Sequence, residues 1–93
     1  MYAVITRADI DTTRPDEAAD MLTGMVVPAT SAAAGFSSGY WMRSTDHSQG
    51  LSVVLFESQA AAAAAAEAQG GGTPPGSAVR QVSVEVMEVT VSA

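Results

Sequence analysis

The chain has 93 residues with ten acidic side chains, four arginines and no lysine, so its net charge at pH 7 is −6. This length fits one domain, residues 1–93, which buries only about 60–65% of the surface that the unfolded chain exposes. The absence of cysteine excludes disulfides and thiolate metal sites. An acidic chain also lacks the cluster of basic side chains that binding to nucleic acids or anionic membranes requires. We therefore expect the core to be shared with a second copy of the chain, as in a homodimer.

Targeting signals are not evident in the sequence. The first residues do not combine a basic start with an apolar stretch, as a signal peptide does. The longest apolar run is the alanine tract 60–66, whereas a membrane-spanning helix needs about 20 residues. We expect a cytoplasmic protein that binds neither membrane nor nucleic acid.

The first predicted elements are a strand and a helix. Residues 2–10 are rich in β-branched and aromatic side chains, which favours a strand. The segment that follows has the composition of a helix start, because Thr13 can cap it and Pro15 suits its first turn. Asp16 also makes a weak capping box with Thr13.

Pro28 leaves two possibilities for the first helix. The helix either ends near Val27, or kinks at Pro28 and continues to a stop at Gly35. We favour the kinked helix, because glycine is the better stop signal.

The second half of the chain predicts a hairpin, a helix and a last strand. Strands are expected at 38–44 and 51–57, joined by a polar loop, and the second of them is apolar on both faces. Ser58 is the expected cap of an alanine-rich helix over 59–69. Residues 70–76 form a glycine- and proline-rich connection, and residues 79–93 alternate as one long strand. Within that strand the apolar residues change face near Met87, which suits either a strand that passes from one environment to another or a bulge there.

The order β-α-β-β-α-β predicts a ferredoxin-like α+β fold with a four-stranded antiparallel sheet and both helices on one face. The strand at 51–57 is apolar on both sides, yet the helices of one chain cover only one side. A second sheet is therefore expected on the other side, which makes a homodimeric barrel.

This pattern resembles the dimeric α+β barrel superfamily, and within it the small proteins related to antibiotic-biosynthesis monooxygenases. The residues that carry the resemblance are Arg7 and Asp9 at the end of the first strand, Pro28 before Gly35-Phe36, Gly39-Tyr40-Trp41, and Phe56-Glu57-Ser58. The superfamily includes cofactor-independent oxygenases, haem-degrading enzymes, isomerases, dehydratases and proteins without assigned activity, so the fold does not choose among them.

The haem-degrading branch of that superfamily fits this chain poorly. That branch relies on an asparagine in the first strand, and on a tryptophan and an axial histidine in the second helix. This chain has no asparagine, its second helix is nearly all alanine, and its one histidine, His47, falls in the hairpin loop. We expect no haem and no other cofactor.

Arg7 and Arg43 are the most specific candidates for a catalytic role. Each lies in a predicted strand, and an arginine in a pocket stabilises an enolate or phenolate, which cofactor-free oxygenation needs before O₂ can react. Ion pairing with one of the many carboxylates is the commoner role for such arginines.

The aromatic residues Tyr40, Trp41 and Phe56 are candidates for contacts with a planar substrate. Tyr40 and Trp41 are expected on opposite faces of one strand, and filling the core or a dimer interface is the commoner role of such rings.

His47 is the only side chain whose unperturbed pKa lies near neutrality, which makes it a formal candidate for a general base. Its neighbours Thr45, Asp46, Ser48 and Gln49 instead indicate an exposed loop. A metal site is not expected, because there is one histidine, no cysteine and no acidic cluster with ligand spacing.

The sequence thus predicts a dimer that binds a small molecule in a pocket between each sheet and its helices. Its possible activity is cofactor-independent monooxygenase-like or isomerase-like chemistry on a small aromatic or polyketide-like substrate. The alternative is a non-catalytic binding or structural homodimer, in which the aromatic and arginine side chains build only the core and the interface.

Overall fold

The computed structural model describes all 93 residues. Its elements follow the predicted order: β1 (Tyr2–Ile10), α1 (Pro15–Met21), η1 (Leu22–Val26), α2 (Val27–Ser31), β2 (Phe36–Arg43), β3 (Gln49–Phe56), α3 (Gln59–Ala68) and β4 (Val79–Glu88). The four strands form one antiparallel sheet in the order β2-β3-β1-β4. This arrangement confirms the ferredoxin-like α+β fold.

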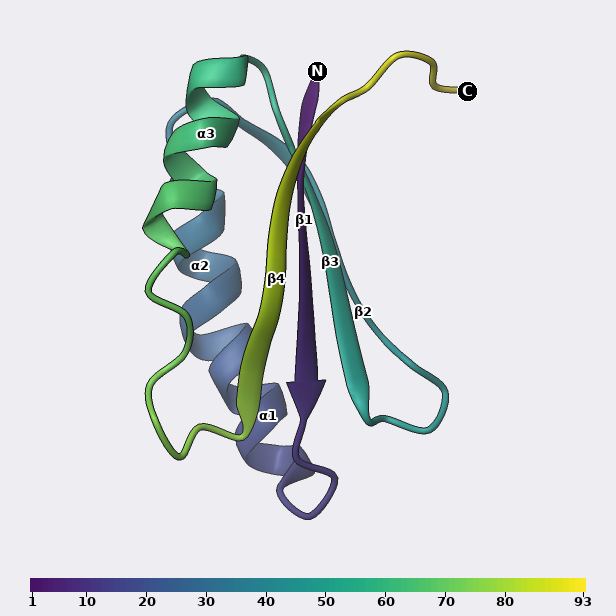
Figure 1. Cartoon of the computed structure of the whole chain (residues 1–93), viewed down its shortest axis with the longest axis vertical. Coiled ribbons are helices and arrows are strands. Elements are labelled where there is room, and N and C mark those ends of the chain that lie inside the picture. The colour runs from purple at the N-terminus through teal and green to yellow at the C-terminus, as the bar shows by residue number, and fades with distance from the viewer.

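All helices lie on one side of the sheet, and no element of the chain covers the other side, here called the open face (Figure 1). Helix α3 packs against β1, β3 and β4, while α2 approaches β2. The two central strands, β1 and β3, therefore have neighbouring strands on both edges but a helix on one face only. No helix is long and apolar enough to cross a membrane.

A small apolar core lies between the sheet and α3. It consists of Val4, Val54, Phe56 and Ala62, and the ring of Phe36 meets that of Phe56 edge-on at a centroid distance of 6.3 Å. The alanine helix can lie this close to the sheet because its side chains are single methyl groups. Only seven of the 93 residues are buried, so the core of one chain is small.

The first helix continues through Pro28, as the kinked alternative predicts. One wide turn, η1, precedes the proline, and the N–H of Val27 bonds to the carbonyl of Leu22, five residues earlier. A proline ring otherwise collides with the carbonyl four residues before it, and the extra residue of a π turn moves that carbonyl away. The helix ends at Ser31, and Gly35 takes a positive φ of 78° in the turn into β2.

The predicted cap of the first helix is wrong, and that of α3 is confirmed. Thr13 lies before the cap position, which Arg14 occupies, and it bonds to Asp11 instead of the helix. The Asp11 carboxylate accepts both the backbone N–H and the hydroxyl of Thr13, and this local turn replaces the predicted cap. The Ser58 hydroxyl does accept the N–H of Ala61, at 3.1 Å.

The last strand differs from its prediction in length and in the place of its bulge. β4 ends at Glu88 because its only neighbour, β1, begins at Tyr2; beyond that pair one backbone bond follows, from the N–H of Val89 to the carbonyl of Met1. The bulge lies at Val82, where the pairs Arg7↔Ser83 and Ala8↔Gln81 leave one residue unmatched. The extra residue turns Val82 to the open face, although alternation alone would place it with Val84 against the helices.

Candidate functional site

A hollow of about 410 Å³ opens on the sheet near the β2–β3 hairpin, and side chains of all four strands form it. Regular alternation puts Arg7 on the open face, opposite Leu51 of β3. Arg43 is the last residue of β2 and also lines the hollow, although it pairs with Gly50, so its side chain starts on the opposite face of the sheet from that of Arg7. The remaining lining residues are Ala8, Asp9, Met42, Ser44, Gln49, Gly50, Leu51 and Val82.

Arg7 and Arg43 share this hollow, although they are 36 positions apart in the sequence. The ion pairs of the chain belong to the other two arginines: Arg14 pairs with Asp11 and Glu17, and Arg80 pairs with Asp9. Neither Arg7 nor Arg43 has a carboxylate within ion-pair distance. The predicted ion pairs for these two residues are therefore absent, and both guanidinium groups are free to bind an anion.

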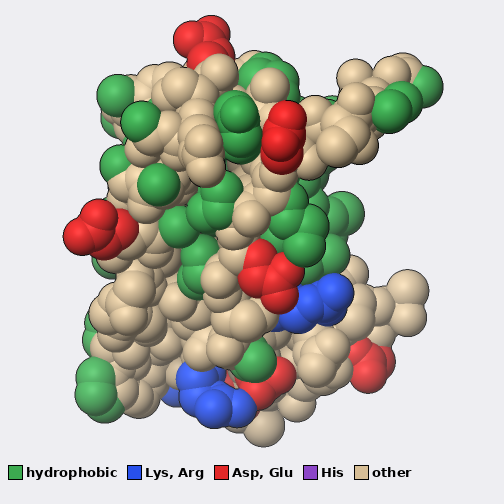
Figure 2. Space-filling model, turned by 45° about the horizontal axis from the view of Figure 1, so that its top comes forward, with side chains coloured by type: hydrophobic (Ala, Val, Ile, Leu, Met, Phe, Trp, Pro, Cys, Tyr) green, Lys and Arg blue, Asp and Glu red, His purple; other side chains and the backbone are tan.

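Apolar side chains line the hollow together with Arg7 and Arg43. Met42 and Val82 line the hollow and are 47% and 56% exposed, so their side chains are accessible to a ligand. Figure 2 shows hydrophobic side chains beside blue arginine and red carboxylate groups on one face of the molecule. A site with adjacent apolar and cationic parts suits a ligand that is apolar at one end and anionic at the other.

The structure separates the predicted aromatic residues. Trp41 packs against the core cluster, and Phe56 is a member of that cluster with 1% exposure. Tyr40 pairs with Val53 and is 64% exposed on the open face. None of the three lines the hollow, which lies on the open face and not between sheet and helices, where the sequence predicted a pocket.

His47 lies in the hairpin loop, exposed and with a positive φ of 64°. Asp46 organises this loop, since one of its carboxylate oxygens accepts bonds from the Ser44 hydroxyl and from the hydroxyl and N–H of Ser48. These bonds stabilise the charged form, with the Ser44 bond contributing most, and lower the pKa of Asp46 to about 2. The polar composition of TDHSQ predicted a loop but not the central role of Asp46.

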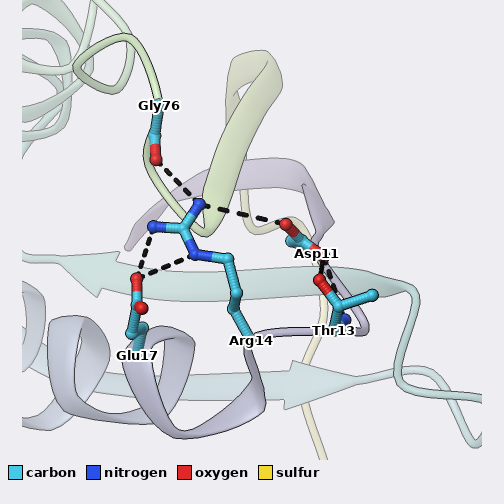
Figure 3. A network of polar contacts seen from close by, with 5 residues as sticks. All are labelled: Asp11, Thr13, Arg14, Glu17 and Gly76. Atoms are coloured by element: carbon cyan, nitrogen blue, oxygen red, sulfur yellow. Dashed lines mark hydrogen bonds and ion pairs between the residues drawn. The ribbon is translucent and has the colours of Figure 1, made fainter.

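A second polar cluster joins the start of α1 to the 70–76 connection (Figure 3). The Arg14 guanidinium donates to Glu17 and, at 2.8 Å, to the Gly76 carbonyl. The bond to Glu17 is the main reason why the pKa of Arg14 is raised, and bonds from Thr13 lower the pKa of Asp11. Each guanidinium nitrogen of Arg14 therefore has a partner within the chain, which favours a structural role for this arginine.

No group of three histidine, aspartate or glutamate side chains is placed to hold a metal ion. The candidate site therefore consists of two arginines, the carboxylate of Asp9, which Arg80 neutralises, polar groups of the hairpin and an apolar wall.

The chain is similar to known proteins in its fold but not in its sequence. No family model and no curated protein matches the chain. The chain is similar in structure to the NE2512 protein of unknown function from Nitrosomonas europaea, with a TM-score of 0.64 and 17% identity, covering 99% of this chain and 91% of that one. It is also similar to a monooxygenase from the gene ActVA-Orf6 of Streptomyces coelicolor, in complex with nanaomycin D, with a TM-score of 0.60 and 17% identity over 99% and 89% of the two chains. The predicted resemblance to antibiotic-biosynthesis monooxygenases is confirmed at the level of the fold.

Proposed function

We propose that this chain forms a homodimer and binds a small anionic aromatic molecule in the hollow between Arg7 and Arg43. The observation that carries the proposal is that both arginines lack a carboxylate partner and line one hollow with an apolar wall. The planar guanidinium group matches the geometry of a carboxylate or phenolate, so two arginines without a carboxylate partner beside one hollow suit an external anion.

The reaction that suits such a site is cofactor-independent oxygenation of a polyketide-like substrate. A guanidinium group stabilises the phenolate or enolate form of the ligand, which is the form that reacts with O₂. Conversion of a ring CH₂ to a carbonyl then uses one O₂, and the second oxygen leaves as water with the two hydrogens. The shared fold with a monooxygenase that binds nanaomycin D supports this choice of ligand class, and isomerisation through the same anion is the related possibility.

The test is ligand binding followed by turnover. Titration with 1-hydroxy-2-naphthoate, an aromatic anion, is expected to give saturable binding that Arg7→Gln and Arg43→Gln each weaken by roughly tenfold, since a charge-assisted hydrogen bond contributes about 1.5–3 kcal/mol. Arg14→Gln is the matched control, because Arg14 carries the same charge but pairs with Asp11 and Glu17 at the start of α1 and does not line the hollow. Oxygen consumption with anthrone-type substrates then tests the reaction. Equal binding by all three variants would show that the hollow is not the site.

The second candidate is a homodimer without catalytic activity. The packing of Trp41 and Phe56 into the core favours it, because these rings then serve the fold and not a substrate. Binding of the naphthoate without oxygen uptake or isomerisation would select a binding protein, and the absence of both would select a structural dimer.

A further inference from the structure

The open face of the sheet carries a row of apolar side chains that nothing in the chain covers. Ile5, Val53 and Leu55 lie at its centre, since alternation puts them opposite the core residues of the same strands. Exposed members extend the row across the sheet to both edge strands, namely Tyr40, Met42, Val82 and Met87.

The accessible surface area of the chain can be compared with that of a typical folded monomer of the same mass. A folded monomer of 9.4 kDa is expected to expose about 5,000 Å². This chain exposes 5927 Å². The excess of about 900 Å² is close to the roughly 800 Å² that each partner buries in a specific protein–protein interface. The excess surface is thus close to the area that a partner of similar size, such as a second copy of the chain, would cover.

The hollow and the apolar row share residues. Met42, Leu51 and Val82 line the hollow and also belong to the open face. The hollow therefore opens toward the space that a second sheet would fill, and its two arginines lie at the border of that space. A ligand held only by one chain would keep its other side in water.

We infer that the second copy closes the hollow, so that binding of the anionic aromatic ligand and dimerisation strengthen each other. This inference rests on the proposed function, because it concerns the same hollow and the same dimer. Thermodynamic linkage makes this coupling equal in both directions. The factor by which the dimer binds the ligand more tightly than the monomer is also the factor by which the ligand tightens the dimer. A second copy that covers the ligand removes the apolar side of the ligand from water, which strengthens ligand binding by a factor of about ten or more.

The experiment compares two methionine variants. Met87→Glu puts a charge on the open face outside the hollow, at a residue that is 48% exposed, so the folded single chain tolerates it. Met25→Glu is the matched control, because Met25 is 64% exposed on η1, on the side of the sheet that carries the helices. Sedimentation velocity over a dilution series gives the dimer dissociation constant, and circular dichroism confirms that each variant is folded.

The expected result is that Met87→Glu weakens the dimer and 1-hydroxy-2-naphthoate binding, each by tenfold or more, whereas Met25→Glu changes neither. Saturating naphthoate is expected to lower the wild-type dimer dissociation constant at least tenfold, and to lose this effect in Arg7→Gln. A monomeric Met87→Glu that binds naphthoate as tightly as the wild type would overturn the inference and leave the proposed binding site intact. A wild-type chain that is monomeric at all concentrations, or a dimer that binds no naphthoate, would overturn the inference together with the proposed function.

Discussion

Gly35, in the turn between α2 and β2, lies close against Ala61 of α3, and its replacement by alanine tests the packing of the fold. A β-carbon at position 35 would lie 2.6 Å from the β-carbon of Ala61. The Ala61 methyl group is attached directly to the helix backbone, so it cannot rotate away. Gly35 also has a φ of +78°, which disfavours any residue with a β-carbon.

The cost of Gly35→Ala has two parts. The positive φ contributes about 1 kcal/mol, and the contact with Ala61 contributes about 1–3 kcal/mol, as for other overpacked cores. The expected loss of unfolding free energy is therefore about 2–4 kcal/mol, and each kcal/mol lowers the melting temperature by roughly 5 °C in a domain of this size.

Two comparisons separate these parts. Gly72 also has a positive φ, of 70°, but nothing lies within 4 Å of its added β-carbon, so Gly72→Ala measures the backbone contribution alone. The double variant Gly35→Ala/Ala61→Gly removes the contact and should recover its contribution of about 1–3 kcal/mol, but it keeps the cost of the positive φ and adds about 1 kcal/mol for glycine inside a helix. Urea unfolding at one fixed protein concentration gives all four free energies. A loss for Gly35→Ala within about 0.5 kcal/mol of that for Gly72→Ala would refute the reasoning, because the contact would then cost nothing.

Two further predictions concern local hydrogen bonds. Ser58→Ala removes the cap of α3 and should lower the unfolding free energy by about 1 kcal/mol, measured by urea unfolding, whereas Thr13→Ala, which removes no cap, should cost less. The pKa of Asp46 is lowered to about 2 in the folded chain, so its hairpin bonds stabilise the fold above the unfolded pKa of about 3.9 and are lost as the pH falls toward 2. Thermal melts between pH 2 and 5 should therefore show a shallower acid dependence for Asp46→Asn, and an unchanged slope would mean that these bonds contribute no stability.

The sequence by itself determined the order and kind of the elements. Strand and helix periods are local properties, and so are the Ser58 cap and the alanine tract, so they can be read from neighbouring residues. The apolar character of residues 51–57 on both faces predicted a strand that is covered on both sides; the structure makes this strand, β3, a central one with helices on one side only. Even the continuation of the helix through Pro28 followed from the better stop signal at Gly35.

Features that depend on a partner far along the chain were decided only by the tertiary structure. β4 stops at Glu88 because β1 starts at Tyr2, although residues 89–93 continue the same alternation. The bulge at Val82 results from pairing with Arg7 and Ala8, and it carries a valine from the helix side to the open face.

The candidate site has the same origin. The sequence named Arg7 and Arg43 separately, and only the sheet order brings them into one hollow. The ion pairs also depend on the tertiary structure. Asp9 pairs with Arg80 and Glu17 pairs with Arg14, which leaves the other two arginines without a carboxylate partner. A residue's chemistry is fixed by its side chain, whereas its partners are fixed by the path of the whole chain.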